Sequence, residues 1–153
     1  MSSYIRAFDA LLDEYGYTGV PYGHLGEGCL HIRIDFPLTT SGGEYRTRQF
    51  LEAAADLVAA HGGSLSGEHG DGRSRSELLP RMYSPAAMQI MHDVKNFFDP
   101  NNLLNPGVIV SAASITDNLR TSTYKPMREN LALHYNTDHH DFSAAVHRCT
   151  GVG

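Results

Sequence analysis

The chain has 153 residues, of which 41% are hydrophobic and 19% charged, and this composition is typical of a soluble globular protein with one packed core. Its 12 basic and 17 acidic side chains give a formal net charge of −5 without a basic stripe, which argues against nucleic acid as a partner. No run of about 18 apolar residues predicts a transmembrane segment, and the first residues lack the apolar stretch of a signal peptide.

Helical and extended patterns alternate in the first 60 residues. Residues 3–15 carry apolar side chains at helical spacing and are followed by Gly16, which predicts a helix that stops there. Residues 20–24 and 28–36 are predicted to be strands on either side of a glycine bend. Residues 44–60 have the clearest helical pattern of the chain.

The next segment completes the expected fold. A short strand is predicted at residues 63–66, before a glycine-rich loop. A second long helix is predicted at residues 84–98, with Ser84 as N-cap and Pro85 at the first helical position. The pattern predicts an α+β fold in which a small antiparallel sheet is covered by the helices at 44–60 and 84–98.

The composition changes beyond Val110. Residues 111–141 are rich in Ser, Thr, Asn, Asp and His with little periodicity, which predicts an extended polar tail or linker. The two cysteines, Cys29 and Cys149, lie far apart and form no disulfide framework, so we expect a reducing, cytoplasmic environment.

Two glycine-rich clusters contain the residues best suited to chemistry. His24 and His31 lie in the first cluster, and seven positions of a straight strand would point them to opposite faces. The glycines between them supply the bend that brings them together. With Glu68 of the second cluster they form a set of two imidazoles and one carboxylate, which suits Zn²⁺, Mn²⁺ or Fe²⁺ and leaves positions open for substrate. The alternative is that both histidines are structural and Glu68 is a solvated acid.

Two further side chains have a functional and a structural interpretation. A metal held by Glu68 would keep the adjacent His69 unprotonated near neutral pH, so that it could take a proton; otherwise His69 is a surface histidine. Arg33 shares a strand face with His31 and could hold a carboxylate in bidentate fashion. The alternative for Arg33 is an ion pair with Asp35 or another acid.

Three motifs, taken in order, resemble one family. They are residues 22–31 (YGHLGEGCLH), 63–73 (GSLSGEHGDGR) and 95–107 (KNFFDPNNLLNPG). Together they resemble the C-terminal part of FAD-linked oxidases of the vanillyl-alcohol oxidase type. The branch is that of the glycolate oxidase flavin subunit, D-lactate dehydrogenase and D-2-hydroxyglutarate dehydrogenase, and the resemblance covers roughly residues 20–110.

The resemblance implies a role for each of the matched positions. It implies ligands of a divalent metal such as Zn²⁺ or Mn²⁺ at His24, His31 and Glu68. It also implies a proton-abstracting base at His69 and a residue near the flavin cofactor, FAD, at Asn105.

Arg33 extends the resemblance to a subset of the family. D-2-hydroxyglutarate dehydrogenases tend to carry asparagine at the position of Arg33. With arginine at this position, the chain more closely resembles the large fusions that join the flavoprotein to an iron–sulfur module. The implied role of Arg33 is to bind a substrate carboxylate. Residues 142–153 resemble the start of that module, with Cys149 as the first cluster ligand. Because a cluster needs about four cysteines and no other follows, Cys149 should be a free thiol here.

The resemblance also implies how the chain is organised. Residues 1–110 would be the C-terminal half of the cap domain with the segment that returns to the flavin domain, and residues 111–153 would lead toward a missing iron–sulfur module. Most of the FAD-binding domain is absent, so we expect part of a flavin-dependent dehydrogenase of 2-hydroxy acids that is inactive alone. Residue spacing by itself leaves open a metal-dependent hydrolase or a non-catalytic docking module.

Overall fold

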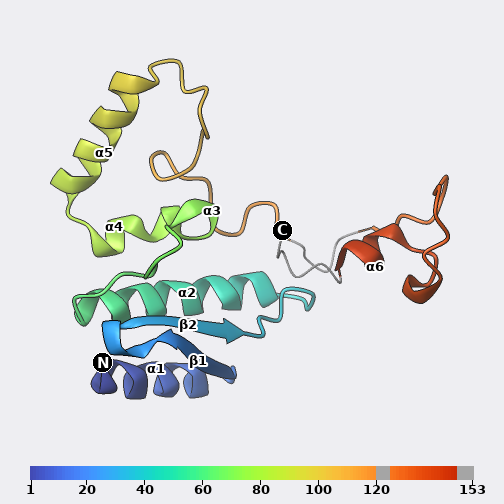
Figure 1. Cartoon of the computed structure of the whole chain (residues 1–153), viewed down its shortest axis with the longest axis horizontal. Helices are drawn as coiled ribbons and strands as arrows, with labels where there is room; N and C mark the ends of the chain where they lie inside the picture. Colours follow the sequence, from blue (N-terminus) through green and yellow to red (C-terminus); the bar gives the residue numbers. More distant parts are fainter. Residues whose placement is uncertain (120–124, 148–153) are drawn as a thin grey trace.

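The computed structural model describes residues 1–119 and 125–147. A two-stranded antiparallel sheet combines with helices, so the predicted α+β class is confirmed (Figure 1). The expected free thiol at Cys149 lies outside the described residues. Within the described residues, no helix is both long and apolar enough to cross a lipid bilayer.

The first three elements agree closely with the sequence pattern. Helix α1 (Ser2–Tyr15) ends at Gly16, which has the left-handed conformation with φ 68°. Strands β1 (Gly19–His24) and β2 (Cys29–Ile34) pair as an antiparallel hairpin. The glycine bend between them is a short 3₁₀ helix, η1 (Leu25–Glu27).

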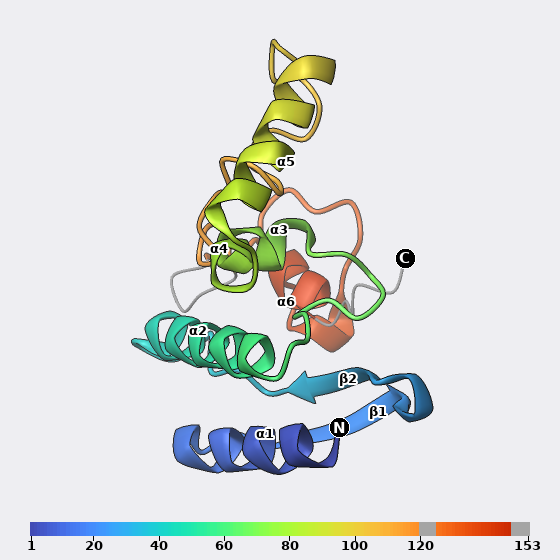
Figure 2. The same ribbon diagram turned by 90° about the vertical axis from the view of Figure 1, so that its left-hand side faces the viewer.

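The main core lies where α1 and the long helix α2 (Gly43–Ala60) pack against each other and against the hairpin (Figures 1 and 2). Phe50 of α2 is 1% exposed, and its ring meets that of Phe8 edge to face at 5.9 Å between centroids. Ile32 and Ile34 of β2 pack on the same cluster. One face of the hairpin therefore belongs to the core, which turns the other face outward.

Helix α5 (Pro85–Phe98) forms as predicted but does not cover the sheet. Ser84 is its N-cap and accepts a hydrogen bond from the backbone N–H of Ala87 at 3.2 Å. The helix has no buried residue and projects away from the hairpin (Figures 1 and 2). The predicted position on the sheet is wrong, because α1 and α2 together bury the inner side of the hairpin.

No strand forms at residues 63–66, although one was predicted there. A strand needs a partner for its ladder, and the second half of this segment bonds to side chains instead. The backbone N–H of Leu65 donates to Met82 Sδ at 3.2 Å, and that of Ser66 donates to Ser64 Oγ at 3.3 Å. This segment is therefore a loop that leads into the second glycine-rich cluster.

Three short helices that the sequence analysis did not predict follow this loop. They are α3 (Gly72–Arg75), η2 (Ser76–Leu78) and α4 (Leu79–Met82). Leu78 and Leu79, which are 2% and 1% exposed, anchor them to the body of the molecule. The glycine-rich loop is thus fixed at its far end.

Residues 111–119 are packed rather than extended. Ile115 is 7% exposed and packs in a second cluster with Leu78. The two terminal nitrogens of the Arg48 guanidinium group donate to Glu77, at 2.7 and 3.0 Å, and the backbone N–H of Ile115 donates to the same carboxylate at 2.7 Å. These contacts lower the pKa of Glu77, chiefly through Arg48. The extended tail expected from residue 111 therefore does not begin there.

Residues 125–147 also make contacts among themselves. They contain the 3₁₀ helix η3 (Asn136–Asp138) and helix α6 (Phe142–His147). Asp141, which is 3% exposed, accepts hydrogen bonds from the backbone N–H of Met127 at 3.0 Å and of Ser143 at 2.9 Å. A local turn structure thus replaces the extended conformation predicted for this stretch.

Asp99 organises the turn that follows α5. Its carboxylate accepts hydrogen bonds from the backbone N–H groups of Leu103 and Leu104, each at 2.9 Å, and forms an ion pair with Lys95. Lys95 also donates to the carbonyl oxygen of Leu104. We call this group of bonds, made by Asp99 with Lys95, Leu103 and Leu104, the Asp99 clamp. The bond from Lys95 and the two backbone bonds lower the pKa of Asp99 to about 2.

We expect this turn to resist acid well below the ordinary pKa of aspartate. Because the folded pKa of Asp99 is about 2 against an ordinary value of 3.8, its contribution is complete above 3.8 and disappears as the pH falls through about 2. The amide resonances of Leu103 and Leu104 should therefore titrate with a midpoint near the lower value. In Asp99→Asn this acid transition should vanish, whereas Asp93→Asn should retain it; a wild-type midpoint close to 3.8 would contradict the clamp.

Candidate active site

The register of the hairpin brings four site side chains onto one face. Tyr22 pairs with His31, and His24 pairs with Cys29. Directly opposite residues of antiparallel strands share a face, so all four lie on the side turned away from the core. The bend predicted between the two histidines is η1, which Gly28 closes with φ 81°. The pairing of the two strands, and not the number of residues between His24 and His31, thus determines on which face of the hairpin each histidine lies.

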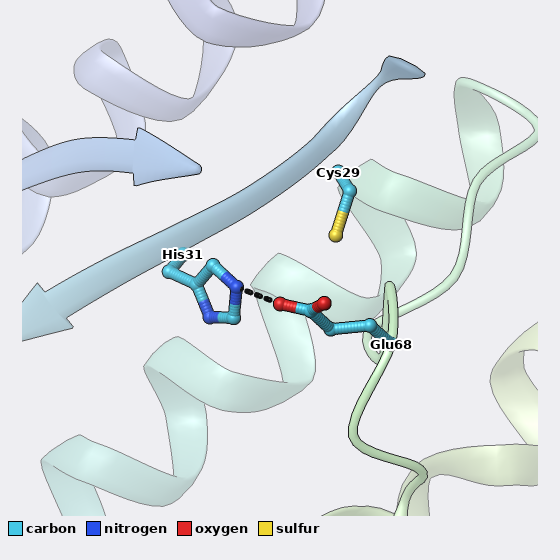
Figure 3. A group of neighbouring side chains, drawn as sticks. All are labelled: Cys29, His31 and Glu68. Atoms are coloured by element: carbon cyan, nitrogen blue, oxygen red, sulfur yellow. Dashed lines mark hydrogen bonds and ion pairs between the residues drawn. The ribbon is translucent and has the colours of Figure 1, made fainter. Parts of the chain in front are cut away.

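Glu68 meets this face from the glycine-rich loop, as Figure 3 shows. His31 Nε2 and Glu68 Oε1 are joined by a hydrogen bond. With Cys29 Sγ they form a group whose ligand atoms all lie within 4.8 Å of one another. Gly67 permits this approach, because a Cβ at that position would lie 2.8 Å from Cys29 Sγ.

The electrostatics favour an ionised carboxylate at Glu68. The hydrogen bond with His31 is the largest effect and lowers the pKa of Glu68, while partial burial opposes it. The charges of His31, His69 and His24 lower that pKa further. An ionised Glu68 can accept hydrogen bonds or bind a cation.

The group opens into a cleft of about 770 Å³ between the hairpin, α1, α2 and the glycine-rich loop. This volume lies in the range of small-molecule sites, which is roughly 300–1,000 Å³. Cys29, His31, Glu68 and His69 all line it. Polar groups from two distant segments therefore face a space large enough for a small ligand.

His69 lies at the edge of this group. Its Nε2 is 3.4 Å from Glu68 Oε1, its ring centroid is 5.2 Å from that of His31, and its side chain is 73% exposed. His24 lies on the same hairpin face and influences the pKa of Glu68. Among the described residues, however, the compact group contains Cys29 and not His24. Sequence reasoning missed Cys29, although its position two residues before His31 places it on the same strand face.

Arg33 lines a neighbouring cleft of about 560 Å³ rather than the first one. Tyr22 borders both clefts, and its ring stacks on His31 with centroids 5.3 Å apart. Asp35 lines the same cleft, yet the described residues include no ion pair between it and Arg33. The exposed guanidinium group remains available to an anion.

Asn105 lies apart from the hairpin, in the turn after α5. It has φ 46° and is exposed, and in the described structure it lines neither cleft. The clamp around Asp99 fixes the residues immediately before it. Of the six predicted site residues, the structure brings His31, Glu68 and His69 into contact, places His24 and Arg33 on the same hairpin face, and leaves Asn105 elsewhere.

Residues 1–109 match the family described as FAD linked oxidases, C-terminal domain. The chain belongs to this family. This FAD-linked oxidase domain includes the hairpin, the glycine-rich loop and α5, so every candidate site residue lies within the match. The resemblance seen in the three motifs is thereby confirmed.

Several curated relatives are similar to the FAD-linked oxidase chain. It is 32% identical over 153 residues to a D-2-hydroxyglutarate dehydrogenase of Haemophilus influenzae, which covers 100% of this chain and 15% of that protein. It is 36% identical over 110 residues to a D-lactate dehydrogenase of Archaeoglobus fulgidus, covering 72% of this chain and 24% of that protein. For a D-2-hydroxyglutarate dehydrogenase of Escherichia coli the identity is 37% over 109 residues, covering 71% and 11%. The chain therefore spans a quarter or less of the length of these relatives.

Proposed function

We propose that this chain supplies the metal- and substrate-binding wall of a flavin-dependent dehydrogenase that oxidises a 2-hydroxy acid of the D-lactate, glycolate or D-2-hydroxyglutarate type. One observation carries the proposal: His31 and Glu68, 37 positions apart, converge in one cleft with His69 beside them. The names of the relatives, D-2-hydroxyglutarate dehydrogenase and D-lactate dehydrogenase, support the substrate class.

The donor set fits a divalent metal. An imidazole nitrogen and an ionised carboxylate already lie in hydrogen-bonding contact, and His24 stands on the same hairpin face. We therefore assign His24, His31 and Glu68 as the residues that hold the ion. A metal bound there polarises the hydroxyl and carboxylate oxygens of a 2-hydroxy acid and acidifies the hydroxyl group.

His69 and Arg33 have separate tasks in this proposal. His69 takes the hydroxyl proton of the substrate at a ring nitrogen, for which its exposed position on the cleft leaves room. Arg33 holds a substrate carboxylate, since its guanidinium group lies on the outward face of the hairpin and is not paired with Asp35.

The segment after α5 fits the edge of a flavin site. Asn105 offers an amide donor and acceptor in a turn fixed by Asp99, beside Leu103 and Leu104, which are 77% and 69% exposed. Such a mixture of apolar surface and one polar group is typical of cofactor sites. FAD, when bound, accepts the hydride from the substrate α-carbon.

The outward side of α5 supplies a surface for the FAD-binding part of the full-length protein. Phe97 and Phe98 are 80% and 76% exposed, and Val94 is 53% exposed. An apolar surface of this kind marks an interface. We assign it to the FAD-binding domain, because the chain spans only 15% of the Haemophilus influenzae relative and because Asn105, proposed to lie near FAD, belongs to the turn that follows α5.

An iron–sulfur module that receives the electrons is part of the same proposal. The similarity to the Haemophilus influenzae relative continues through all 153 residues, beyond the end of the family match at residue 109. This extension supports the assignment of residues 111–153 as the connection to a further module.

A reducing, cytoplasmic location is consistent with the free thiol of Cys29.

The full-length protein, purified with FAD, provides the test. Under anaerobic conditions, D-lactate, glycolate and D-2-hydroxyglutarate are added separately, and reduction of the flavin is followed by absorbance. We expect one of the three to bleach the flavin, and the isolated 153-residue chain with added FAD and a dye acceptor to show no turnover. If none of these acids reduces the flavin, the proposed function is wrong; ester hydrolysis by the isolated chain with Zn²⁺ would favour a hydrolase instead.

A further inference from the structure

We infer that the thiol of Cys29 is a ligand of the metal site, together with His31 and Glu68, and that it selects Zn²⁺ over Mn²⁺ or Mg²⁺. The inference deepens the proposed function by naming the kind of ion, and it rests on the metal site of that proposal rather than on the oxidation reaction. It starts from the compact group of Figure 3, in which sulfur, nitrogen and oxygen donors face one another.

The distances are compatible with one shared ion. Zinc bonds of about 2.0–2.3 Å at a tetrahedral angle hold the ligand atoms about 3–4 Å apart. The three ligand atoms here lie within 4.8 Å of one another. The separations of the ligand atoms are therefore close to those around a bound ion.

The backbone presents two of the three donors from a rigid element. Cys29 and His31 are two positions apart on β2, so their side chains leave the strand on the same face. Their positions are fixed by the ladder with β1, and the His31 ring is further held by stacking on Tyr22. A ligand pair arranged before the ion arrives loses little conformational freedom on binding.

The loop that carries Glu68 passes close to the Cys29 sulfur atom. Gly67 passes so close to Cys29 that a Cβ would lie 2.8 Å from Sγ. Glycine at this position therefore lets the loop bring the carboxylate up to the thiol. Cys29 is only partly buried and forms no disulfide, so its sulfur is chemically available.

The donor chemistry determines which ion binds. Thiolate is a soft ligand that favours Zn²⁺, whereas Mn²⁺ and Mg²⁺ prefer oxygen donors. When the ion binds, the Cys29 thiol releases its proton to solvent and the sulfur forms the bond to the metal. His31 and Glu68 exchange their mutual hydrogen bond for bonds to the ion. In this ligand set Cys29 takes the place assigned to His24 above, and three protein ligands would leave one coordination position for a substrate oxygen.

Cobalt(II) spectroscopy tests the sulfur ligand directly. In the 153-residue chain with Cys149→Ser, Cys29 is the only cysteine. Anaerobic titration with Co²⁺ should produce the near-ultraviolet charge-transfer absorption of a cobalt–thiolate bond. Zn²⁺ should displace the cobalt at a concentration at least about 10-fold lower than Mn²⁺ needs. Zn²⁺ should also slow alkylation of the thiol, whereas Mg²⁺ should not.

Two further variants in this background separate the ligands. Cys29→Ser should abolish the charge-transfer absorption and weaken Zn²⁺ binding at least about 10-fold, with far less effect on Mn²⁺. His24→Ala should retain the absorption. Circular dichroism checks that each variant is folded, and the alkylation experiment needs no variant at position 29.

The outcomes distinguish this inference from the proposals above. Co²⁺ binding without a sulfur band, or alkylation that Zn²⁺ does not slow, overturns ligation by Cys29 and leaves His24, His31 and Glu68 as the metal ligands. A chain that binds none of the ions overturns both assignments. The dehydrogenase function is decided separately, by flavin reduction in the full-length protein.

Discussion

Replacing His69 with alanine in the full-length enzyme should lower kcat by about 10²- to 10⁴-fold, the usual contribution of a general acid–base group. The alanine side chain cannot take the hydroxyl proton, so the proton must pass to solvent in the transition state. Because the His69 side chain is 73% exposed, its removal should leave the fold and the FAD content unchanged. Steady-state turnover with a 2-hydroxy acid and a dye acceptor, beside the flavin spectrum, measures both effects.

His134→Ala is the matched control, since His134 is exposed and lines neither cleft. It should have the turnover of the wild-type enzyme. Essentially intact turnover in His69→Ala would show that another group, or water, takes the proton.

Phe50→Ala should destabilise the isolated chain by about 3–5 kcal/mol, the range measured for truncation of buried aromatic residues. Phe50 is 1% exposed and lies at the centre of the cluster formed by α1, α2 and the hairpin. Its ring contacts four other aromatic rings, those of Phe8, Tyr15, Tyr17 and Phe36. Urea denaturation followed by circular dichroism measures the loss, which approaches the whole stability of a small domain.

Phe97→Ala is the control of the same residue type. Phe97 is 80% exposed on α5, so its truncation should change the free energy of unfolding by no more than about 0.5 kcal/mol. Equal losses in the two variants would mean that α5 is part of the cooperative core, contrary to the packing described above.

The elements that pack against each other within the chain are also those that the sequence predicts well. Helices α1 and α2 bury one face in the same cluster, so helical periodicity marks both. The position of α5 could not be predicted in the same way. Its periodic apolar residues show that the helix has an apolar side, but periodicity does not name the partner that covers it, and none of the residues of α5 is fully buried in the structure.

The short helices between residues 72 and 82 could not be predicted for a different reason. Elements of three or four residues contain at most about one turn, which is too short for a periodic signal. The segment 63–66 finds no neighbouring strand and remains a loop. Both features depend on tertiary contacts rather than on local sequence.

The candidate site was partly predictable because its motifs are local. The contact between His31 and Glu68 agrees with the expectation that the two glycine-rich clusters converge. A straight strand would separate His24 and His31, and the glycine bend expected between them allows the hairpin pairing that puts both on one face. Cys29 was not among the predicted ligands, although the same alternation places it on the strand face of His31.

The two ends of α5 are secured by residues of its own segment. Ser84 closes the first turn, and the clamp of Lys95 and Asp99 closes the last. The helix therefore holds its shape before anything covers it, and a partner would meet a preorganised surface. Because the helix is already ordered, it loses little backbone entropy when a partner binds. The burial of Phe97 and Phe98 can then contribute almost fully to the free energy of binding.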